Sequence, residues 1–231
     1  MKIKYLHPFD VTYREAAALQ EALREKLILC DASPRAMNSV AGADVSYARN
    51  SDLFFAAVIV LSYPEMEIIE EAYATRKTSF PYIPGLLSFR EGPALLEAFA
   101  QLRQVPDVVL FDGQGIAHPR GMGLAAHLGL FLNIPAIGCA KSRLWGLHSD
   151  VGERVGDCVP LTNAGEPIGA VVRTKTKVKP VFVSPGNCIS LERAVEVVLS
   201  CGRGYRLPEP VRKAHLAVNR FRQAQAGSLT A

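Results

Sequence analysis

The chain has 231 residues, 49% of them hydrophobic, enough for one domain with a sizeable core or at most two small domains. It holds no run of 18 apolar residues and no apolar signal core near its N-terminus, which argues against a membrane span and against secretion. The net charge of +4 permits nucleic-acid binding without demonstrating it, and five scattered cysteines without a CxxC motif predict a reducing, cytoplasmic location.

The first half of the chain predicts one helix and an antiparallel meander. Residues 12–29 are typical of an amphipathic helix that opens with Thr12 and Glu15 in capping-box spacing, and Pro34 then marks a loop. Strand-like runs joined by short polar connections follow, at 39–47, 53–62 and 67–75.

The second half predicts helices that alternate with buried strands. Residues 88–102 indicate a helix, with Ser88 and Glu91 in capping-box spacing. Short, wholly apolar runs are typical of buried parallel strands. The remaining predicted elements are strands at 108–111, 135–140, 165–172 and 178–184, the last two spaced for a hairpin, and helices at 122–132, 191–199 and 210–225. Residues 224–231 are expected to form a disordered tail.

This order of elements predicts an α/β fold, in which a mixed sheet has an antiparallel meander followed by parallel strands and is flanked by helices. No Pro/Gly/Ser-rich linker divides the chain, so we expect a single domain over residues 1–231. In the simplest topology the first strand is central. Asp44 then lies beside the end of the 108–111 strand, which leads into Asp112, and Glu91 on the intervening helix faces both.

Three carboxylates stand where short elements begin or end. Asp44 lies in SVAGADVSY, Glu91 lies just inside a predicted helix, and Asp112 ends the apolar run VPDVVLFD. Acids brought together in this way can hold magnesium, and two such ions can activate a water and stabilise a leaving oxygen in phosphodiester cleavage. Any one of these acids alone is more often a surface group or a helix cap. Basic residues at 173–179 and in the C-terminal segment either neutralise phosphates near the acids or are solvated charges.

Six segments, in this order, resemble the endonuclease V family. They are GADVSY at 42–47, PYIPGLLSFREGPALLEAF at 81–99, PDVVLFDGQGIAHPRGMGLAAHLG at 106–129, NIPAIGCAKSRLWG at 133–146, VFVSPGNCISLERAVEVV at 181–198 and RLPEPVRKAHLAVNRFR at 206–222. The resemblance implies an RNase H-like fold and a magnesium-dependent endonuclease, with manganese as a substitute. It also implies an enzyme that recognises hypoxanthine in DNA, cleaves the second phosphodiester bond 3′ to that base, and acts in repair of deaminated adenine.

The resemblance further implies roles for individual residues. Asp44, Asp112 and Glu91 are the expected catalytic acids and metal ligands, and His215 is an expected catalytic-site group near the metal. A loop stiffened by two prolines, with an aromatic at its tip, can act as a wedge that separates stacked bases. The expected wedge consists of Pro81, Tyr82, Ile83 and Pro84.

A base-binding pocket is expected behind this wedge. Glycine has no side chain to block a ligand, so Gly85 and Gly113 are expected to bring backbone amides close to the extruded base, with Leu144 covering it. The side chains expected to contact the strand near the metal are His118, Arg120 and Lys141. His127, on an apolar helix, is instead expected to be a hydrogen-bonded structural histidine.

Two alternatives stay open at this point. Family members differ in whether they act on DNA or on inosine-containing RNA, and the 2′-hydroxyl contacts that decide this cannot be read from a sequence. A non-catalytic reader of hypoxanthine would be marked by the loss of an acid, and all three acids are present. We expect a monomer whose partner is DNA containing deoxyinosine, or RNA containing inosine.

Overall fold

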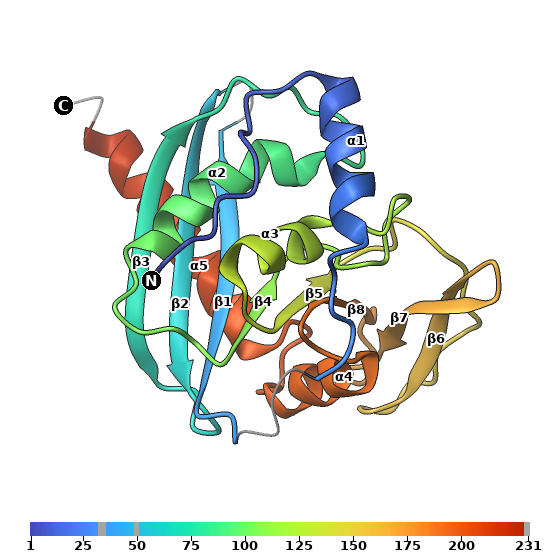
Figure 1. The fold of residues 1–231 in the computed structure, drawn as a ribbon. Coiled ribbons are helices and arrows are strands. Elements are labelled where there is room, and N and C mark those ends of the chain that lie inside the picture. Colours follow the sequence, from blue (N-terminus) through green and yellow to red (C-terminus); the bar gives the residue numbers. More distant parts are fainter. Residues whose placement is uncertain (32–35, 49–50, 229–231) are drawn as a thin grey trace.

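The structure is a computed structural model that describes residues 1–31, 36–48 and 51–228, so the loop expected at Pro34 lies outside the described residues. Eight strands form one sheet in the spatial order β3-β2-β1-β4-β5-β8-β7-β6, with helices on both of its faces (Figure 1). The strands are β1 Ser39–Tyr47, β2 Leu53–Ser62, β3 Ile68–Lys77, β4 Val108–Phe111, β5 Ala136–Ala140, β6 Cys158–Asn163, β7 Glu166–Val172 and β8 Val181–Asn187. The helices are α1 Tyr13–Arg24, α2 Leu87–Ala100, α3 Leu124–Leu132, α4 Leu191–Ser200 and α5 Glu209–Ser228.

The predicted α/β fold with a mixed sheet is confirmed. β1, β2 and β3 pair as an antiparallel meander, and β4 runs parallel to both β1 and β5. β7 pairs antiparallel with β8, as the hairpin spacing predicted, but also with β6, which was not predicted. The β6 sequence CVPLTN contains a proline and has only one buried residue, so it lacks the apolar run that marks the other strands.

Of the two capping boxes predicted from the sequence, one is present in the structure and the other is not. In α1, the Thr12 side chain accepts from the Glu15 N–H and the Glu15 side chain accepts from the Thr12 N–H, which confirms the first. The second is wrong, because α2 already begins at Leu87 and its N-cap makes no side-chain hydrogen bond. Ser88 therefore lies inside the helix, where its hydroxyl is 2.7 Å from Nδ1 of His127.

Two helix ends also differ from the prediction. α1 ends at Arg24 instead of continuing to residue 29. α5 continues to Ser228, so residues 224–228 are helical and not part of a disordered tail. The run QAQA at 223–226 extends the helix because alanine and glutamine are good helix formers. Residues 229–231 of the expected tail lie outside the described part of the chain.

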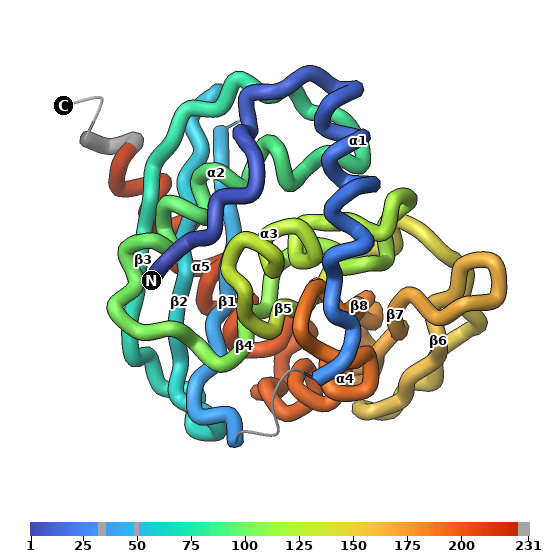
Figure 2. Tube along the Cα trace, in the orientation of Figure 1, coloured from blue at the N-terminus to red at the C-terminus, as the bar shows by residue number. Residues whose placement is uncertain are grey.

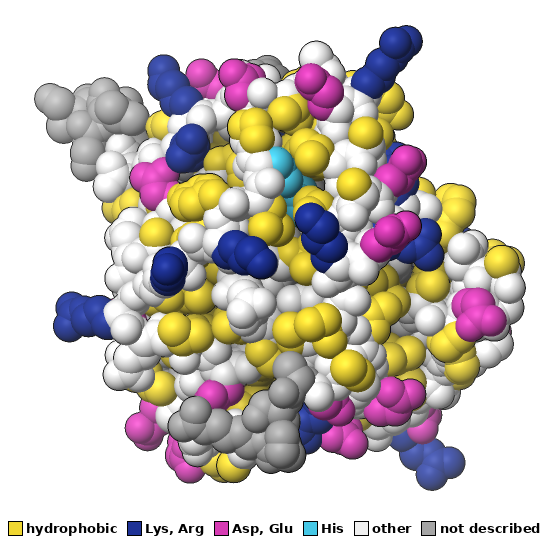
Figure 3. Space-filling model, in the orientation of Figure 1, with side chains coloured by type: hydrophobic (Ala, Val, Ile, Leu, Met, Phe, Trp, Pro, Cys, Tyr) yellow, Lys and Arg dark blue, Asp and Glu magenta, His cyan; other side chains and the backbone are white. Residues whose placement is uncertain are grey.

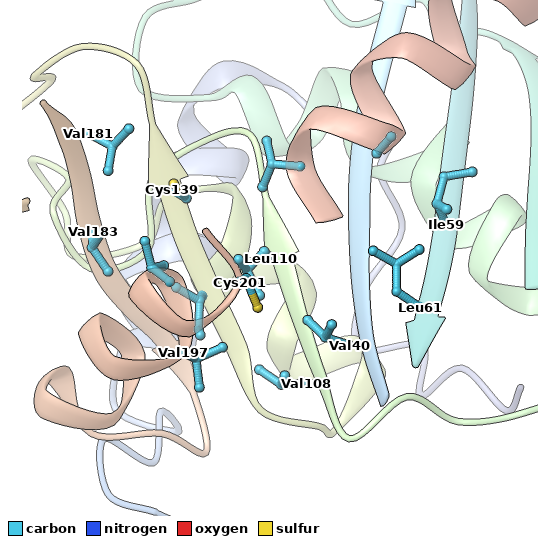
Figure 4. Packing of buried hydrophobic residues seen from close by; sticks show 14 of the residues in the cluster. Val40, Ile59, Leu61, Val108, Leu110, Cys139, Val181, Val183, Val197 and Cys201 are labelled. Atoms are coloured by element: carbon cyan, nitrogen blue, oxygen red, sulfur yellow. The ribbon is translucent and has the colours of Figure 1, made fainter. Parts of the chain in front are cut away.

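Side-chain alternation along the central strands divides the core into two layers. On β1, Val40 faces the layer that packs against α4 and α5, whereas Ala41 and Ala43 face the layer against α2 and α3. Figure 4 shows the first layer, in which side chains such as Val40 and Leu110 from the strands meet Val197 of α4. Both faces of the sheet are therefore covered, as is usual where parallel strands occur.

The N-terminal segment lies over the α2–α3 layer. It crosses α3, where the Lys4 N–H donates to the Phe131 carbonyl at 2.8 Å, and its first residues lie beside the end of α2 (Figure 2). On the face shown in Figure 3, Lys and Arg side chains are spread among exposed hydrophobic side chains instead of gathering in one patch. Among the described residues, no helix is long and apolar enough to cross a membrane.

A buried chain of hydrogen bonds ties the N-terminal segment to α3 and α2. His7 Nδ1 lies 2.7 Å from the Pro8 carbonyl, which only accepts, so Nδ1 carries the proton. His7 Nε2 must then accept from His127 Nε2 at 2.7 Å, which leaves His127 Nδ1 to accept from the Ser88 hydroxyl at 2.7 Å. The expected structural role of His127 is confirmed, and both histidines are neutral in this arrangement.

We expect this row of hydrogen bonds to make the folded protein less stable at acidic pH. Burial, then the charges of His7 and His118, lowers the pKa of His127 from 6.5 to about 3, and burial lowers the pKa of His7. Below pH 6.5 the unfolded state takes up protons that the folded state does not. The free energy of unfolding should then fall by about 1.4 kcal/mol per pH unit because of His127, until its folded-state pKa is reached, and the half-buried His7 adds a smaller loss.

Melting temperatures measured between pH 6.5 and pH 4 should show this loss in the wild type, and a smaller loss in His127→Gln. Glutamine can still bond to Ser88 but takes up no proton. His148→Gln, on the loop before β6, serves as the control and should keep the wild-type slope. Equal slopes for all three proteins would contradict the assignment.

Candidate active site

Strand register brings Asp44 and Asp112 together where the parallel pairing of β1 with β4 ends. Ala43 lies opposite Phe111, and the Asp112 N–H donates to the Ala43 carbonyl at 3.3 Å. Ala43 and Phe111 both face the α2–α3 layer, so the next residue on each strand points to the opposite face. The two aspartates therefore lie side by side, as the sequence predicted, with His215 of α5 close to both.

His215 reaches this pair from α5. Its Nδ1 lies 2.8 Å from Asp44 Oδ2, and a carboxylate only accepts, so Nδ1 carries the proton. The Asn219 amide donates to the His215 carbonyl at 2.8 Å and lies 3.4 Å from Nε2, while the Ser46 hydroxyl donates to Asn219 Oδ1 at 2.9 Å. The imidazole is thus held from both sides, and it fixes the orientation of the Asp44 carboxylate.

Gly42 allows α5 to come this close. A Cβ at position 42 would lie only 1.9 Å from the carbonyl oxygen of Pro210, in the first turn of α5. Atoms do not approach that closely without a bond, so any side chain at residue 42 would push the helix away from β1. The glycine two residues before Asp44 therefore sets how near His215 can come.

Glu91 joins the site electrostatically from α2. Burial, then the charges of Asp44 and Asp112, raises the pKa of Glu91 to about 8, with Arg90 acting in the opposite direction. Burial and the charge of Asp112 also raise the pKa of Asp44, although the hydrogen bond from His215 lowers it. Burial and the neighbouring acids thus make ionisation of these carboxyl groups unfavourable, and a bound cation would offset that cost.

The residues present fit a divalent cation. One potential ligand atom from each of Asp44, Asp112 and His215 lies within 4.8 Å of the other two. Two carboxylates suit Mg²⁺, and the imidazole is accepted more readily by Mn²⁺. Lys141, at the end of β5, forms an ion pair with Asp112 Oδ2. Glu91 is not part of this cluster, so its role as a direct ligand stays a prediction.

A pocket of about 350 Å³ opens beside Asp112. Most of the residues expected to contact the substrate line it: Tyr82, Ile83, Pro84, Gly85, Gly113, His118, Lys141 and Leu144. Pro81 and Arg120 are not in the lining. The structure also brings in residues that the sequence analysis did not single out, among them Gln20 of α1 and Gln114, which follows β4. Their contribution depends on tertiary contacts, for which the sequence offers no local signal.

His118 and Arg120 hold the end of the expected wedge loop at Gly85. His118 Nε2 and Arg120 Nη2 each lie 2.9 Å from the Gly85 carbonyl oxygen, and Gln20 Nε2 donates to it at 3.1 Å. Gly85 has φ +80°, which favours glycine. Burial lowers the pKa of His118 to about 4, so it is a neutral donor here. Contact of either side chain with a nucleic acid stays a prediction.

The expected wedge is exposed at its tip and packed at its base. Tyr82 is 66% exposed, whereas Ile83 packs against a cluster that includes Phe80 and Phe89. Arg90 Nη1 donates to the Phe80 carbonyl at 2.6 Å, which fixes the start of the loop. A rigid loop that presents an aromatic side chain beside a pocket has the geometry that a wedge requires.

One residue of the C-terminal basic segment, Arg206, lies beside Lys141. Arg206 donates to the Lys141 carbonyl and, at 2.8 Å, to the carbonyl of Pro180, which follows the 173–179 stretch. Arg212 lies 4.2 Å from the ring centroid of Tyr205. Arg206 therefore lies beside the Lys141 backbone, and whether the two basic segments neutralise phosphates near the acids stays a prediction.

Two solved structures of endonuclease V are similar to this chain over most of its length. The endonuclease V of Bacillus subtilis matches with a TM-score of 0.93 at 33% identity, covering 99% of this chain and 100% of that one. The endonuclease V of Ciona intestinalis, solved in complex with a 24mer DNA containing an inosine followed by a ribo-adenosine, matches with a TM-score of 0.79 at 32% identity, covering 91% of this chain and 98% of that one. The fold and the site thus define a nuclease, a hydrolase of phosphodiester bonds.

Sequence comparison gives the family. The sequence model of endonuclease V matches residues 21–216. An endonuclease V of Dehalococcoides mccartyi is 50% identical over 217 residues, which make up 94% of this chain and 97% of that protein. The chain belongs to the endonuclease V family, and the resemblance seen in its sequence is confirmed.

The role of Gly42 can be tested by replacement with alanine. Gly42→Ala should lower the free energy of unfolding by about 3 kcal/mol, since overpacking against backbone costs this much, and should weaken Mn²⁺ binding because His215 moves away from Asp44. Urea unfolding and calorimetric titration with Mn²⁺ measure the two effects. Gly202→Ala, where the added Cβ meets only the Leu199 carbonyl oxygen at 3.0 Å, should change neither by much. A Gly42→Ala protein with wild-type stability and affinity would refute the constraint.

Proposed function

We propose that this nuclease acts on deoxyinosine in DNA and hydrolyses the second phosphodiester bond 3′ to the hypoxanthine nucleotide, with Mg²⁺ or Mn²⁺ as cofactor. The volume of its pocket, about 350 Å³, is within the range of sites that bind small ligands. A base rotated out of the duplex would enter the pocket, while Tyr82 and Ile83 fill the gap in the stack. The Ciona intestinalis complex with inosine-containing DNA supports this substrate class.

The observation that carries the proposal is an unpaired acceptor in the pocket wall. Gln114 is only 7% exposed, and its Nε2 donates to the Ser142 carbonyl at 3.0 Å. That carbonyl only accepts, so the orientation of the amide is settled and Oε1 is left without a partner in the described residues. Oε1 is shielded from solvent, so a base in the pocket would meet it once the Gln114 side chain shifts, and the N1–H donor of hypoxanthine would then satisfy it. Adenine has a lone pair at N1, which would leave Oε1 facing another acceptor.

Asp112 links recognition to cleavage, because it belongs both to the pocket wall and to the acid cluster. The bond that is cleaved would therefore lie within the next one or two nucleotides of the bound base. Asp44 and Asp112 would hold the cation, which activates water and stabilises the leaving oxygen when bound. Lys141, which pairs with Asp112, would bind a phosphate oxygen, and His215 keeps Asp44 oriented.

End-labelled oligonucleotides with one deoxyinosine test the activity. A single nick at the second bond 3′ to the inosine, dependent on Mg²⁺ or Mn²⁺ and blocked by EDTA, is the expected result. Asp112→Asn should lower the rate about a thousand-fold, equivalent to several kcal/mol of lost transition-state stabilisation, while Glu97→Gln, an exposed acid on the same helix as Glu91, should cleave normally.

Matched RNA, and DNA with one ribonucleotide after the inosine, complete the experiment. Cleavage of RNA alone would replace deoxyinosine with inosine in RNA as the substrate. Equal cleavage of oligonucleotides with adenine in place of hypoxanthine would refute recognition of the base.

The Gln114 contact has its own test. Gln114→Leu should weaken binding of deoxyinosine oligonucleotides about ten-fold, the cost of losing one buried hydrogen bond. Wild-type protein should bind 1-deazahypoxanthine, which lacks the N1–H, with a similar loss. The combination of variant and analogue should lose little more than either alone, because both remove the same bond. Fully additive losses would show that Oε1 and N1–H do not meet.

A further inference from the structure

The loop after β5 exposes three large apolar side chains in four positions. Leu144 is 47% exposed, Trp145 is 40% exposed and Leu147 is 72% exposed. Single exposed apolar residues are common, but several together mark a surface that binds something. Trp145 is the one tryptophan of the chain, and its ring makes no hydrogen bond or ring contact within the described residues.

This loop is held rigidly. Leu147 and Thr162 of β6 exchange two backbone hydrogen bonds of 2.8 Å. Gly146 has φ +88°, and a Cβ there would lie 3.0 Å from both the Thr162 carbonyl oxygen and the Ile168 side chain. The backbone from Gly146 to Leu147 is thus held against β6 and β7. Trp145 directly precedes this anchored segment, which reduces the ordering that binding there would require.

The exposed side chains continue directly from the pocket. Leu144 lines the pocket together with Lys141 and Arg143, and Trp145 is the next residue beyond Leu144. The surface therefore begins at the proposed position of the extruded base and has two cations along it. An apolar, aromatic surface edged by positive charge fits a nucleic-acid strand, whose bases stack and whose phosphates are negative.

We propose that Trp145, edged by Leu144 and Leu147, is a stacking platform for the nucleotide next to the hypoxanthine nucleotide on the same strand. The inference rests on the proposed function and adds a second base contact to it. One base enters the pocket under Leu144, and its neighbour leaves the duplex stack and lies on the indole. A neighbour held in this way keeps the strand from re-pairing while the bond beside Asp112 is cleaved.

The single tryptophan makes the platform directly observable. Wild-type protein is titrated in EDTA, which prevents cleavage, with short fluorescein-labelled single-stranded DNA containing one deoxyinosine. Anisotropy of the label reports binding, and indole emission reports Trp145 alone. Binding should quench the emission. An abasic site next to the inosine on one side should remove the quenching, whereas an abasic site on the other side should not.

Variants then measure the contribution to affinity. Trp145→Ala should weaken binding about ten-fold, within the range for losing one base–aromatic stack, and Trp145→Phe should retain most of the affinity. Tyr5→Ala removes an aromatic side chain that is 70% exposed and packs against Phe131, away from the pocket lining, and should bind like the wild type. Circular dichroism melting of each variant checks that the fold is kept.

Four outcomes are decisive against the platform. Inosine-dependent binding with unchanged indole emission would overturn it and leave the proposed function intact, as would wild-type affinity in Trp145→Ala. Emission that changes with protein concentration in the absence of DNA would assign the surface to contact between two copies of the chain. Anisotropy that does not distinguish inosine from adenosine would instead refute the proposed function, and the platform with it.

Discussion

The parallel pairing of β1 with β4 is the constraint on which the rest of the site depends. Side chains alternate between the two faces of a sheet, so a shift of one residue in this pairing would turn Asp112 toward α2 and α3, away from Asp44. The register is well determined, because both faces of these strands are buried and each face has its own apolar set. The last hydrogen bond of the pairing, from Asp112 N–H to the Ala43 carbonyl, lies where the acids begin. The strand register that packs the core is thus the same register that aligns the two carboxylates.

Each acid of the site has one basic neighbour, and each neighbour comes from a different direction. His215 of α5 bonds to Asp44, Lys141 at the end of β5 pairs with Asp112, and Arg90 of α2 favours ionised Glu91. The pKa values of Asp44 and Glu91 nevertheless stay raised, first because of burial and then because of the other acids. The protein scaffold therefore tolerates repulsion at this point and compensates for it through the well-packed sheet beneath. A cation-binding site requires this kind of residual negative charge.

The sequence was sufficient for the elements that carry their own pattern. Apolar runs identified β1, β2, β4 and β5, and strand order then placed Asp44 beside Asp112. The predictions that were wrong or missing have physical reasons. Ser88 and Glu91 have the spacing of a capping box, but packing of Leu86 and Phe89 starts the helix earlier. β6 was missed because its pairing with β7, not its own hydrophobicity, makes it a strand. Gln20 and Gln114 reach the pocket from elements far apart in the chain, and Trp145 is informative only because the fold leaves it exposed.

Gly42 has a consequence for how the enzyme is made. Asp44 and His215 are 171 positions apart in the sequence, and the histidine arrives on the last helix, which docks against the first strand. Domains of growing chains form from the N-terminus onward during synthesis. A nascent chain can therefore contain both aspartates before α5 has been made and can pack against Gly42. The nuclease gains its oriented carboxylate only after α5 has emerged from the ribosome and packed against Gly42, so the two aspartates exist in the chain before the histidine that orients one of them.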